Sequence, residues 1–449
     1  MKRNPAHGIV RRALLAATLL VVALWTRTAE ALPSFAQQTG EPCKSCHVGA
    51  YGPQLKAYGR DFKLFGYVSG DGGNHLPPIT AIFTESSTHT HVDRTPIPGY
   101  GANDNIAYQG ALIAYAGNVG WGVGAFAEAT YDALRDKWSI SRVDVRRAFT
   151  TTFGDRDLVL GVELNNRPGL GDLWNSTPVF EFSTFTSPFA PSPATAAAVD
   201  GRLAARAGGV GAYGLWNDTV YAEGALYTPL DRNLRNREGV STPPTTDEPD
   251  GISPYWRIAL QHDFGQHHYG EIGAYGLQTR RFPNDRVTAG HDTFTDWALD
   301  GTYQYDGGNH HYLTAHATWI NEDIDLSASR RLQGTAASNR LNVFRADAIY
   351  SYDNTWTPGV EYFRTTGTSD PRFFRNPVGR PDTEGYVLEL AYVPLGKPNS
   401  VVNWANARFN LRWVEYTRFN GNRAGASDSN TIYVGAAFAL APFGALVTR

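Results

Sequence analysis

Two cysteines and a histidine lie close together near the start of the chain, in the run Cys43-Lys44-Ser45-Cys46-His47. The C-x-x-C-H spacing suits covalent haem attachment, because two thiols can reach the vinyl groups of one porphyrin while the next imidazole binds the iron. A zinc site would need four ligands, and these are the only two cysteines. A thioredoxin-like redox pair would lie in a βαβ unit, and no such pattern surrounds the motif. The residues therefore predict one c-type haem, bound by Cys43, Cys46 and His47.

The first 31 residues have the layout of a secretory signal peptide. Basic residues such as Lys2 and Arg3 precede an apolar run, 13–25, and Ala29-Glu30-Ala31 matches an A-x-A cleavage pattern. A membrane-anchoring helix is the alternative, but the apolar run is short for one. After Leu32 no stretch approaches the length of a transmembrane helix. We therefore expect an exported protein with a cleaved signal peptide, in the compartment where c-type haem is attached.

The sixth ligand of the iron is constrained by the scarcity of methionine. The only methionine is Met1, which leaves with the signal peptide, so the His/Met ligation of many cytochromes c is excluded. A second histidine, an unusual ligand and an open position remain. His75 is the nearest histidine in sequence and is the candidate distal ligand, although a solvated loop histidine is the commoner role. His89 and His91 follow it, and His316 is a more remote candidate.

The haem motif lies in a segment, 32–77, that is too small to be stable as a free-standing domain. Apolar residues recur in it at helical spacing, at Leu55, Tyr58, Phe62 and Phe65. Gly66 follows where a helix end is expected. We expect this apolar face to lie against the porphyrin, with an ordinary packing helix as the alternative. The haem and the rest of the chain must supply the missing stability.

From residue 78 the sequence changes to segments of about ten residues with alternating polarity. In one of them Phe409 and Leu411 alternate with Arg408 and Asn410, so one face would meet lipid and the other water. About sixteen such segments begin near residues 79, 106, 121, 139, 157, 203, 218, 253, 267, 295, 309, 341, 355, 384, 403 and 430. Short and long connections alternate, and the longest is 166–201.

These segments predict an all-β transmembrane barrel of about 16 antiparallel strands, 78–449, in the outer membrane of a Gram-negative bacterium. Glycine (46), tyrosine (23), phenylalanine (22) and tryptophan (11) are abundant and only 18% of residues are charged, which fits a β-rich wall with aromatic girdles. A soluble β-sandwich or propeller is the alternative. The net charge of −3 gives no indication of a nucleic-acid partner.

The connection between the haem segment and the first strand is short, so we expect the α-helical cytochrome c segment to plug or cap the lumen. A barrel of this size has a bore that its own side chains leave open. Iron porphyrin performs one-electron chemistry, and the protein positions it. A single redox centre placed across an insulating membrane would be an electron conduit.

Several runs of the sequence carry a family resemblance: FAQQTG (35–40), GRDFKLFGY (59–67), LPP (76–78), LNNRP (164–168), DLWNSTP (172–178), GVGAY (209–213) and WND (216–218). These runs are spread over nearly the whole mature chain. Through them the chain resembles the fused outer-membrane cytochrome–porins, which include the iron oxidases of iron-oxidising bacteria. The resemblance implies that Cys43, Cys46 and His47 carry the haem. It implies no residue that binds the iron substrate.

The leading functional hypothesis is oxidation of extracellular Fe(II), with electrons passing through the haem to a periplasmic carrier such as a soluble cytochrome. Ligation without methionine lowers the haem potential, which suits iron oxidation at neutral pH. A second hypothesis is that electrons follow the same path but are exchanged with another extracellular electron donor or acceptor. A third is a solute porin whose haem is a structural plug or sensor.

Other polar residues are weaker candidates for metal binding. Acidic loop residues that would attract Fe(II), unless they are simply solvated, are Asp93, Asp104, Asp247 and Glu248. The pairs His267-His268 and His310-His311 are also candidate metal ligands. Neighbours in a strand face opposite sides, however, so one ion cannot easily use both.

Overall fold

The computed structural model describes residues 32–70, 77–180, 182, 186–240, 247–308, 310–376, 378–397, 400 and 402–441. The expected signal peptide and His75 lie outside the described residues. No helix in this part of the chain is long and apolar enough to cross a bilayer.

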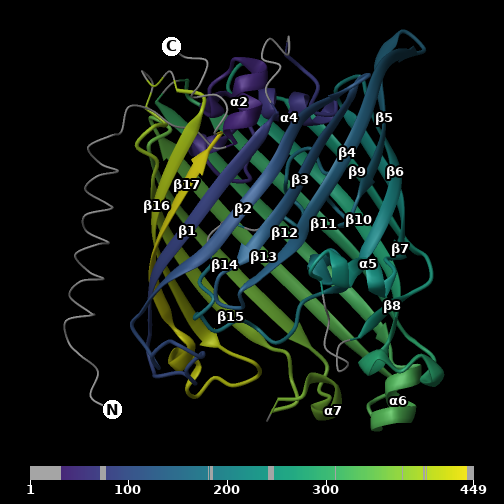
Figure 1. Cartoon of the computed structure of the whole chain (residues 1–449). Coiled ribbons are helices and arrows are strands. Elements are labelled where there is room, and N and C mark those ends of the chain that lie inside the picture. Colours follow the sequence, from purple (N-terminus) through teal and green to yellow (C-terminus); the bar gives the residue numbers. More distant parts are fainter. Residues whose placement is uncertain are drawn as a thin grey trace.

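The described chain forms a closed antiparallel β-barrel (Figure 1). Its strands are β1 (Ile79–Thr90), β2 (Asn105–Gly120), β3 (Val123–Asp132), β4 (Lys137–Phe153), β5 (Arg156–Asn165), β6 (Ala207–Trp216), β7 (Val220–Pro229), β8 (Glu248–Asp250), β9 (Ser253–Asp263), β10 (His268–Phe282), β11 (Asp292–Asp306), β12 (His311–Asp325), β13 (Ser338–Tyr352), β14 (Trp356–Gly367), β15 (Thr383–Tyr392), β16 (Ala405–Arg418) and β17 (Thr431–Leu440). Neighbours in sequence pair, and β1 closes the barrel by pairing with both β2 and β17. The short β8 and the longer β9 pair with successive parts of β10, so together they fill one of sixteen positions.

The predicted barrel is confirmed, and each predicted strand start lies within four residues of an observed one. Closure of the barrel excludes the sandwich and the propeller. The alternation of polarity is confirmed as well: Arg408 and Asn410 are buried toward the lumen, whereas Leu411 is 49% exposed on the outer face. The same alternation on the other strands gives the barrel a polar lumen and an apolar outer wall.

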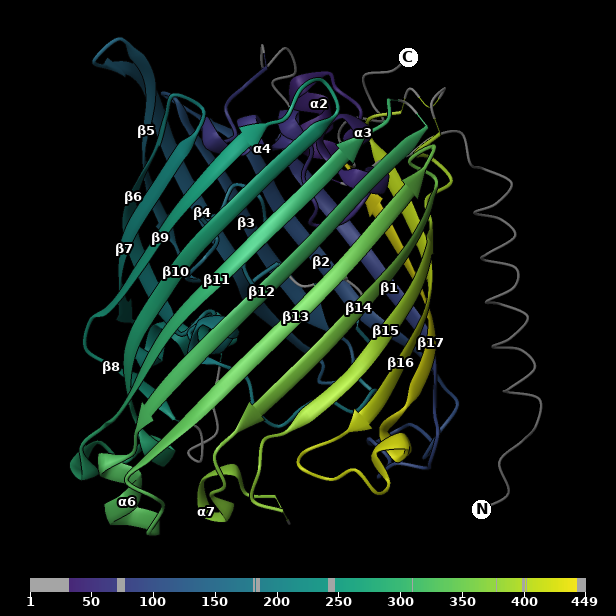
Figure 2. The same cartoon turned by 180° about the vertical axis from the view of Figure 1, so that it is seen from behind.

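The two ends of the barrel differ in their connections. Mostly short turns join the strands at the end where β1 begins, which we call the near end; the connection 393–404 is the long exception. Mostly longer connections, several with short helices, join them at the far end, where α6 and α7 lie (Figure 2); the connection 133–136 is the short exception. The helices are α2 (Pro33–Thr39), α3 (Cys43–Cys46), α4 (Ala57–Leu64), α5 (Arg232–Arg237), α6 (Ser327–Gln333) and α7 (Pro371–Phe374), with single turns η1 (Val48–Ala50), η2 (Ala198–Arg202), η3 (Pro283–Asp285), η4 (Val287–Ala289) and η5 (Ala426–Ser429).

The N-terminal segment, 32–70, lies in the near end of the barrel, where α2 and α4 are seen in Figure 1. Strands from around the wall form hydrogen bonds with this segment. Asp144 of β4 accepts from Tyr67 (2.6 Å), and Gln304 of β11 accepts from Arg60 (2.6 Å). Tyr213 of β6 donates to the Leu64 carbonyl (2.8 Å), and Asn406 of β16 donates to the Ala50 carbonyl (3.0 Å). These bonds tie a segment without a sufficient core of its own to the barrel wall.

The connection between β5 and β6, 166–206, folds inward and is called the lumen loop. Its described parts reach distant walls: Asp200 pairs with Arg345 of β13 (2.6 Å), and the Pro191 carbonyl accepts from Tyr416 of β16 (3.1 Å). Ser187 bonds to Thr88 of β1 (2.6 Å). The loop therefore crosses the bore that the strands alone would leave open.

Candidate haem site

The three haem-motif residues are brought together by one helical turn. Pro42 precedes α3 with an extended backbone, and the His47 amide closes the turn on the Cys43 carbonyl (2.7 Å). Cys43 and Cys46 are therefore close on one turn, while His47 leaves the helix in an extended conformation and bridges to Leu55. All three side chains line a single cavity.

This haem cavity has about 790 Å³ of empty space, counting its open mouth, and mostly apolar walls. Four aromatic rings form one side. Phe35 contacts Phe62, Tyr67 and Phe126 with ring centroids 4.9, 5.5 and 6.2 Å apart. An apolar cleft with a few polar groups is typical of a cofactor site.

Three separate parts of the chain build the cavity. The N-terminal segment supplies the motif, β3 and β4 supply Phe126, Arg142 and Asp144, and the lumen loop supplies Leu170, Asn175 and Phe180. The sequence pointed only to the first part. The alternation on β3 and β4 indicates which residues face the lumen, but no pattern shows which strands or which loop meet the motif.

The residues present fit a covalently bound haem. His47 Nδ1 is buried without a hydrogen-bond partner, while the Gly52 backbone interacts with the same ring. Burial lowers the pKa of His47 to about 4, which keeps the imidazole in the neutral form that binds metals. A metal-bound histidine usually donates its second ring N–H to a nearby group such as a backbone carbonyl. Cys43 and Cys46 would hold the haem, His47 would bind its iron, and the haem would supply one-electron chemistry.

The candidate distal ligands do not meet at this cavity. His75 is outside the described residues, so its role stays a prediction. His89 lies near the far end of β1, is exposed and pairs with Asp104 (2.7 Å). His316 is turned into the lumen, as expected, but it bonds to Asp347 (2.9 Å) and lines a different cavity. Among the described histidines, His47 alone lines the haem cavity.

The expected apolar face of α4 needs a correction. Leu55 and Phe62 line the cavity, but Tyr58 is exposed and Phe65 packs against a separate cluster that includes Trp174. Gly59 and Lys63 take their places in the cavity wall. Gly59 is required there, because a Cβ at this position would lie 2.5 Å from the Cys46 carbonyl oxygen.

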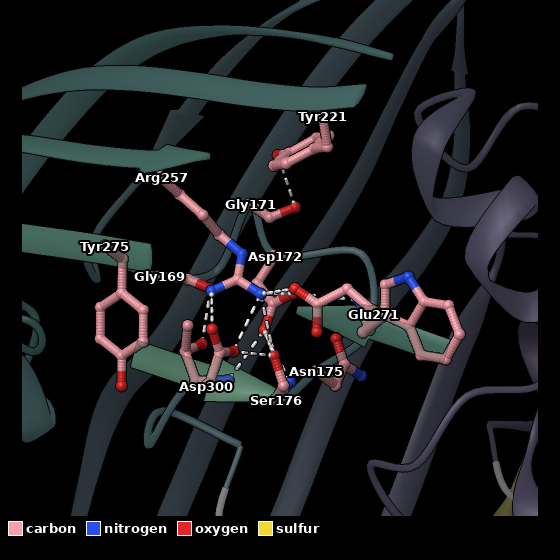
Figure 3. A network of polar contacts seen from close by, with 12 residues as sticks. Gly169, Gly171, Asp172, Asn175, Ser176, Tyr221, Arg257, Glu271, Tyr275 and Asp300 are labelled. Carbon is pink, nitrogen blue, oxygen red and sulfur yellow. Dashed lines mark hydrogen bonds and ion pairs between the residues drawn. The ribbon is translucent and has the colours of Figure 1, made fainter. Parts of the chain in front are cut away.

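A buried ionic network holds the lumen loop against the wall beside this cavity (Figure 3). Arg257 of β9 lies within 2.6 Å of Glu271, 2.9 Å of Asp300 and 3.4 Å of Asp172, the last of these on the lumen loop. Asp172 also accepts from the amides of Ser176 and Thr177. One guanidinium therefore pairs with three buried carboxylates and holds the loop that carries Asn175.

Replacing Arg257 by methionine should release the lumen loop. It would leave buried carboxylates without their cation, and breaking such a pair costs about 3–5 kcal/mol. We expect hydrogen exchange of the amides at 172–177 to accelerate accordingly, since opening of the loop becomes that much easier. Arg135→Met, at an exposed surface pair, is the control. Equal protection in both variants would show that the network does not anchor the loop.

The haem cavity opens into a chain of larger spaces. A lumen cleft with about 1690 Å³ of empty space shares Leu32, His47, Arg142 and Phe180 with it. A far pocket with about 920 Å³ of empty space, lined by Asp93 among others, shares Pro188 with the cleft. Along β1–β4 the spaces thus succeed one another from the haem cavity toward the far end.

The other predicted metal residues remain apart. Glu248 pairs with Arg235 (2.7 Å), and Asp104 with His89. His268 bonds to Tyr303 and His311 to Tyr350, each on the neighbouring strand. Within the described residues, no three His, Cys, Asp or Glu side chains are grouped to hold a metal ion.

The fold, a sixteen-stranded antiparallel barrel, is similar to solved outer-membrane porins. A loop-deletion mutant of OmpT, an outer-membrane protein of Vibrio cholerae, has a TM-score of 0.43 at 10% identity, over 80% of this chain and 98% of that chain. An anion-selective porin from Comamonas acidovorans has a TM-score of 0.43 at 12% identity, over 81% of this chain and 98% of that chain. No family model and no curated protein matches the chain.

Proposed function

We propose that this protein is an outer-membrane monohaem cytochrome–porin that transfers electrons across the outer membrane of a Gram-negative bacterium. One observation carries the proposal: Cys43, Cys46 and His47 line one apolar cavity whose other walls come from the barrel and the lumen loop. The apolar outer face supports a position in a membrane, since its strands turn Leu388, Leu411 and Trp413 outward.

We propose extracellular Fe(II) as the electron donor and a periplasmic carrier, such as a soluble cytochrome, as the acceptor. The succession of far pocket, lumen cleft and haem cavity favours a small soluble donor that approaches the haem from inside the barrel. The carrier would approach at the near end, where Tyr58 and Asp61 of α4 are exposed. Another extracellular donor or acceptor would use the same path.

Anaerobic mixing of the purified, oxidised protein with Fe(II) tests this function. We expect the absorption bands of reduced haem to appear rapidly. Full reduction by dithionite with no reduction by Fe(II) would show that the protein is a working cytochrome whose electron donor is another redox couple. Absence of a haem spectrum in the exported protein would contradict the cytochrome function itself.

A second function, a solute porin with a structural haem plug, is favoured by the wide lumen cleft and by the charged lumen wall. Conductance across a planar bilayer separates the two. An open, salt-dependent pore with a redox-inert haem would support the solute porin, and low conductance with reducible haem would support electron transfer.

A further inference from the structure

Two cationic side chains line the largely apolar haem cavity: Arg142 of β4 and Lys63 of α4. The cavity also has two carboxylates, and both are already engaged. Asp144 pairs with the fully buried Arg146 (3.0 Å) and accepts from Tyr67, while Glu41 lies exposed and accepts from Ser45 (2.9 Å). The cavity therefore offers positive charge to whatever occupies it.

Within the described residues, neither cation has a carboxylate partner closer than 3.7 Å. The nearest to Arg142 is Glu128, 3.7 Å from Nη1, and the buried Nε of Arg142 has no hydrogen-bond partner. Lys63 donates to the Asp172 carbonyl and to Asn175 Oδ1, which are neutral acceptors. An ammonium group has three donors, so these two bonds leave capacity for an anion.

Arg142 lies where an apolar space adjoins a more open one. Arg142 lines both the apolar haem cavity and the more open lumen cleft. A haem is apolar over its macrocycle and carries two propionate carboxylates along one edge. A guanidinium is the side-chain group best suited to bind a carboxylate, because it can donate two parallel N–H···O hydrogen bonds to it.

We propose that Arg142 and Lys63 bind the two propionate groups of the haem. The proposal rests on the proposed function, because it requires that haem be attached in this cavity. Burial lowers the pKa of Lys63 to about 7, and a nearby propionate would offset that desolvation cost. The lumen loop would then take part in haem binding, since Asn175 and Asp172 orient the Lys63 ammonium.

This arrangement has a measurable consequence for the haem potential. A cation beside a propionate keeps it ionised and stabilises the reduced iron relative to a site without the cation. The other titratable or charged groups that line the haem cavity and the lumen cleft are Glu41, Cys43, Cys46, His47, Tyr51, Lys63, Tyr67, Glu128, Tyr131, Asp132, Asp144 and Arg167. The test must therefore compare variants rather than rely on one pH profile.

The experiment measures the haem midpoint potential against pH for the full-length protein and for Arg142→Gln, Arg142→Lys and Lys63→Gln. We expect both glutamine variants to have a lower midpoint potential at neutral pH. The pH range over which the midpoint potential changes should move up by about 1 pH unit or more. Arg142→Lys should restore most of the potential. Arg147→Gln, exposed on the same strand, should leave the profile unchanged.

The outcomes separate this inference from the proposed function. Profiles of both glutamine variants equal to that of Arg147→Gln, in a protein with intact covalent haem, would overturn the propionate assignment alone. A shift in only one of them would overturn the assignment of the other residue. A protein that carries no covalent haem would instead overturn the function on which the inference rests.

Discussion

The double variant Cys43→Ala/Cys46→Ala is expected to lose covalent haem completely and, with it, reduction by Fe(II), while the barrel stays folded. The thiols are the only groups of the chain that can form thioether bonds. They contribute little to the wall, whose strands are held by their own pairing. Haem staining of a denaturing gel measures attachment, and far-ultraviolet circular dichroism reports the barrel.

Two further variants sharpen this test. Ser45→Ala changes a side chain between the two cysteines that bonds only to the exposed Glu41, so haem should stay attached. His47→Ala should keep the thioether bonds but change the absorption spectrum, because the iron loses its imidazole. Covalent haem in the double cysteine variant would show that the motif is not the attachment site.

Narrowing the lumen cleft should slow the reaction with Fe(II) without altering the haem. Thr84 of β1 and Thr130 of β3 both line the cleft, and tryptophan at both positions would fill part of it. We expect the rate of haem reduction by Fe(II) to fall on the order of tenfold, equivalent to about 1.4 kcal/mol in activation free energy. Stopped-flow absorption under anaerobic conditions measures this rate.

Phe83→Trp is the matched control, since Phe83 is the neighbour of Thr84 that points outward (40% exposed). The spectrum of oxidised haem should be the same in all of these proteins. An unchanged rate in the double tryptophan variant would mean that the donor reaches the haem by another route, such as the near end of the barrel.

Much of the barrel could be predicted from the sequence, because successive side chains of each strand must face water and an apolar environment in turn. That alternation placed the strand starts and turned Arg408 and Asn410 to the lumen. The haem motif was equally local: its chemistry depends on five consecutive residues. Features that depend on a period of two, or on a short motif, are visible in one sequence.

The rest of the site depends on contacts that no short pattern encodes. In β4 a bulge opposite Glu128/Ala129 shifts the pairing between Ile140 and Arg142, so alternation counted from the start of the strand does not give the face of Arg142. The lumen loop has no strand period, and its inward course depends on the distant Arg257. The helical spacing of α4 likewise could not show that Gly59, rather than Tyr58, meets the motif.

The packing of the cysteines has a consequence for how the protein matures. Cys43 is only 5% exposed and belongs to a cluster with Tyr433 and Ala437 of β17, the last strand among the described residues. Chemistry at the thiol requires room for a porphyrin and for the machinery that delivers it. Under the proposed function, attachment would therefore precede closure of the barrel around the N-terminal segment. Maturation would be ordered in time: haem first on an open chain in the periplasm, then insertion and closure around the finished segment.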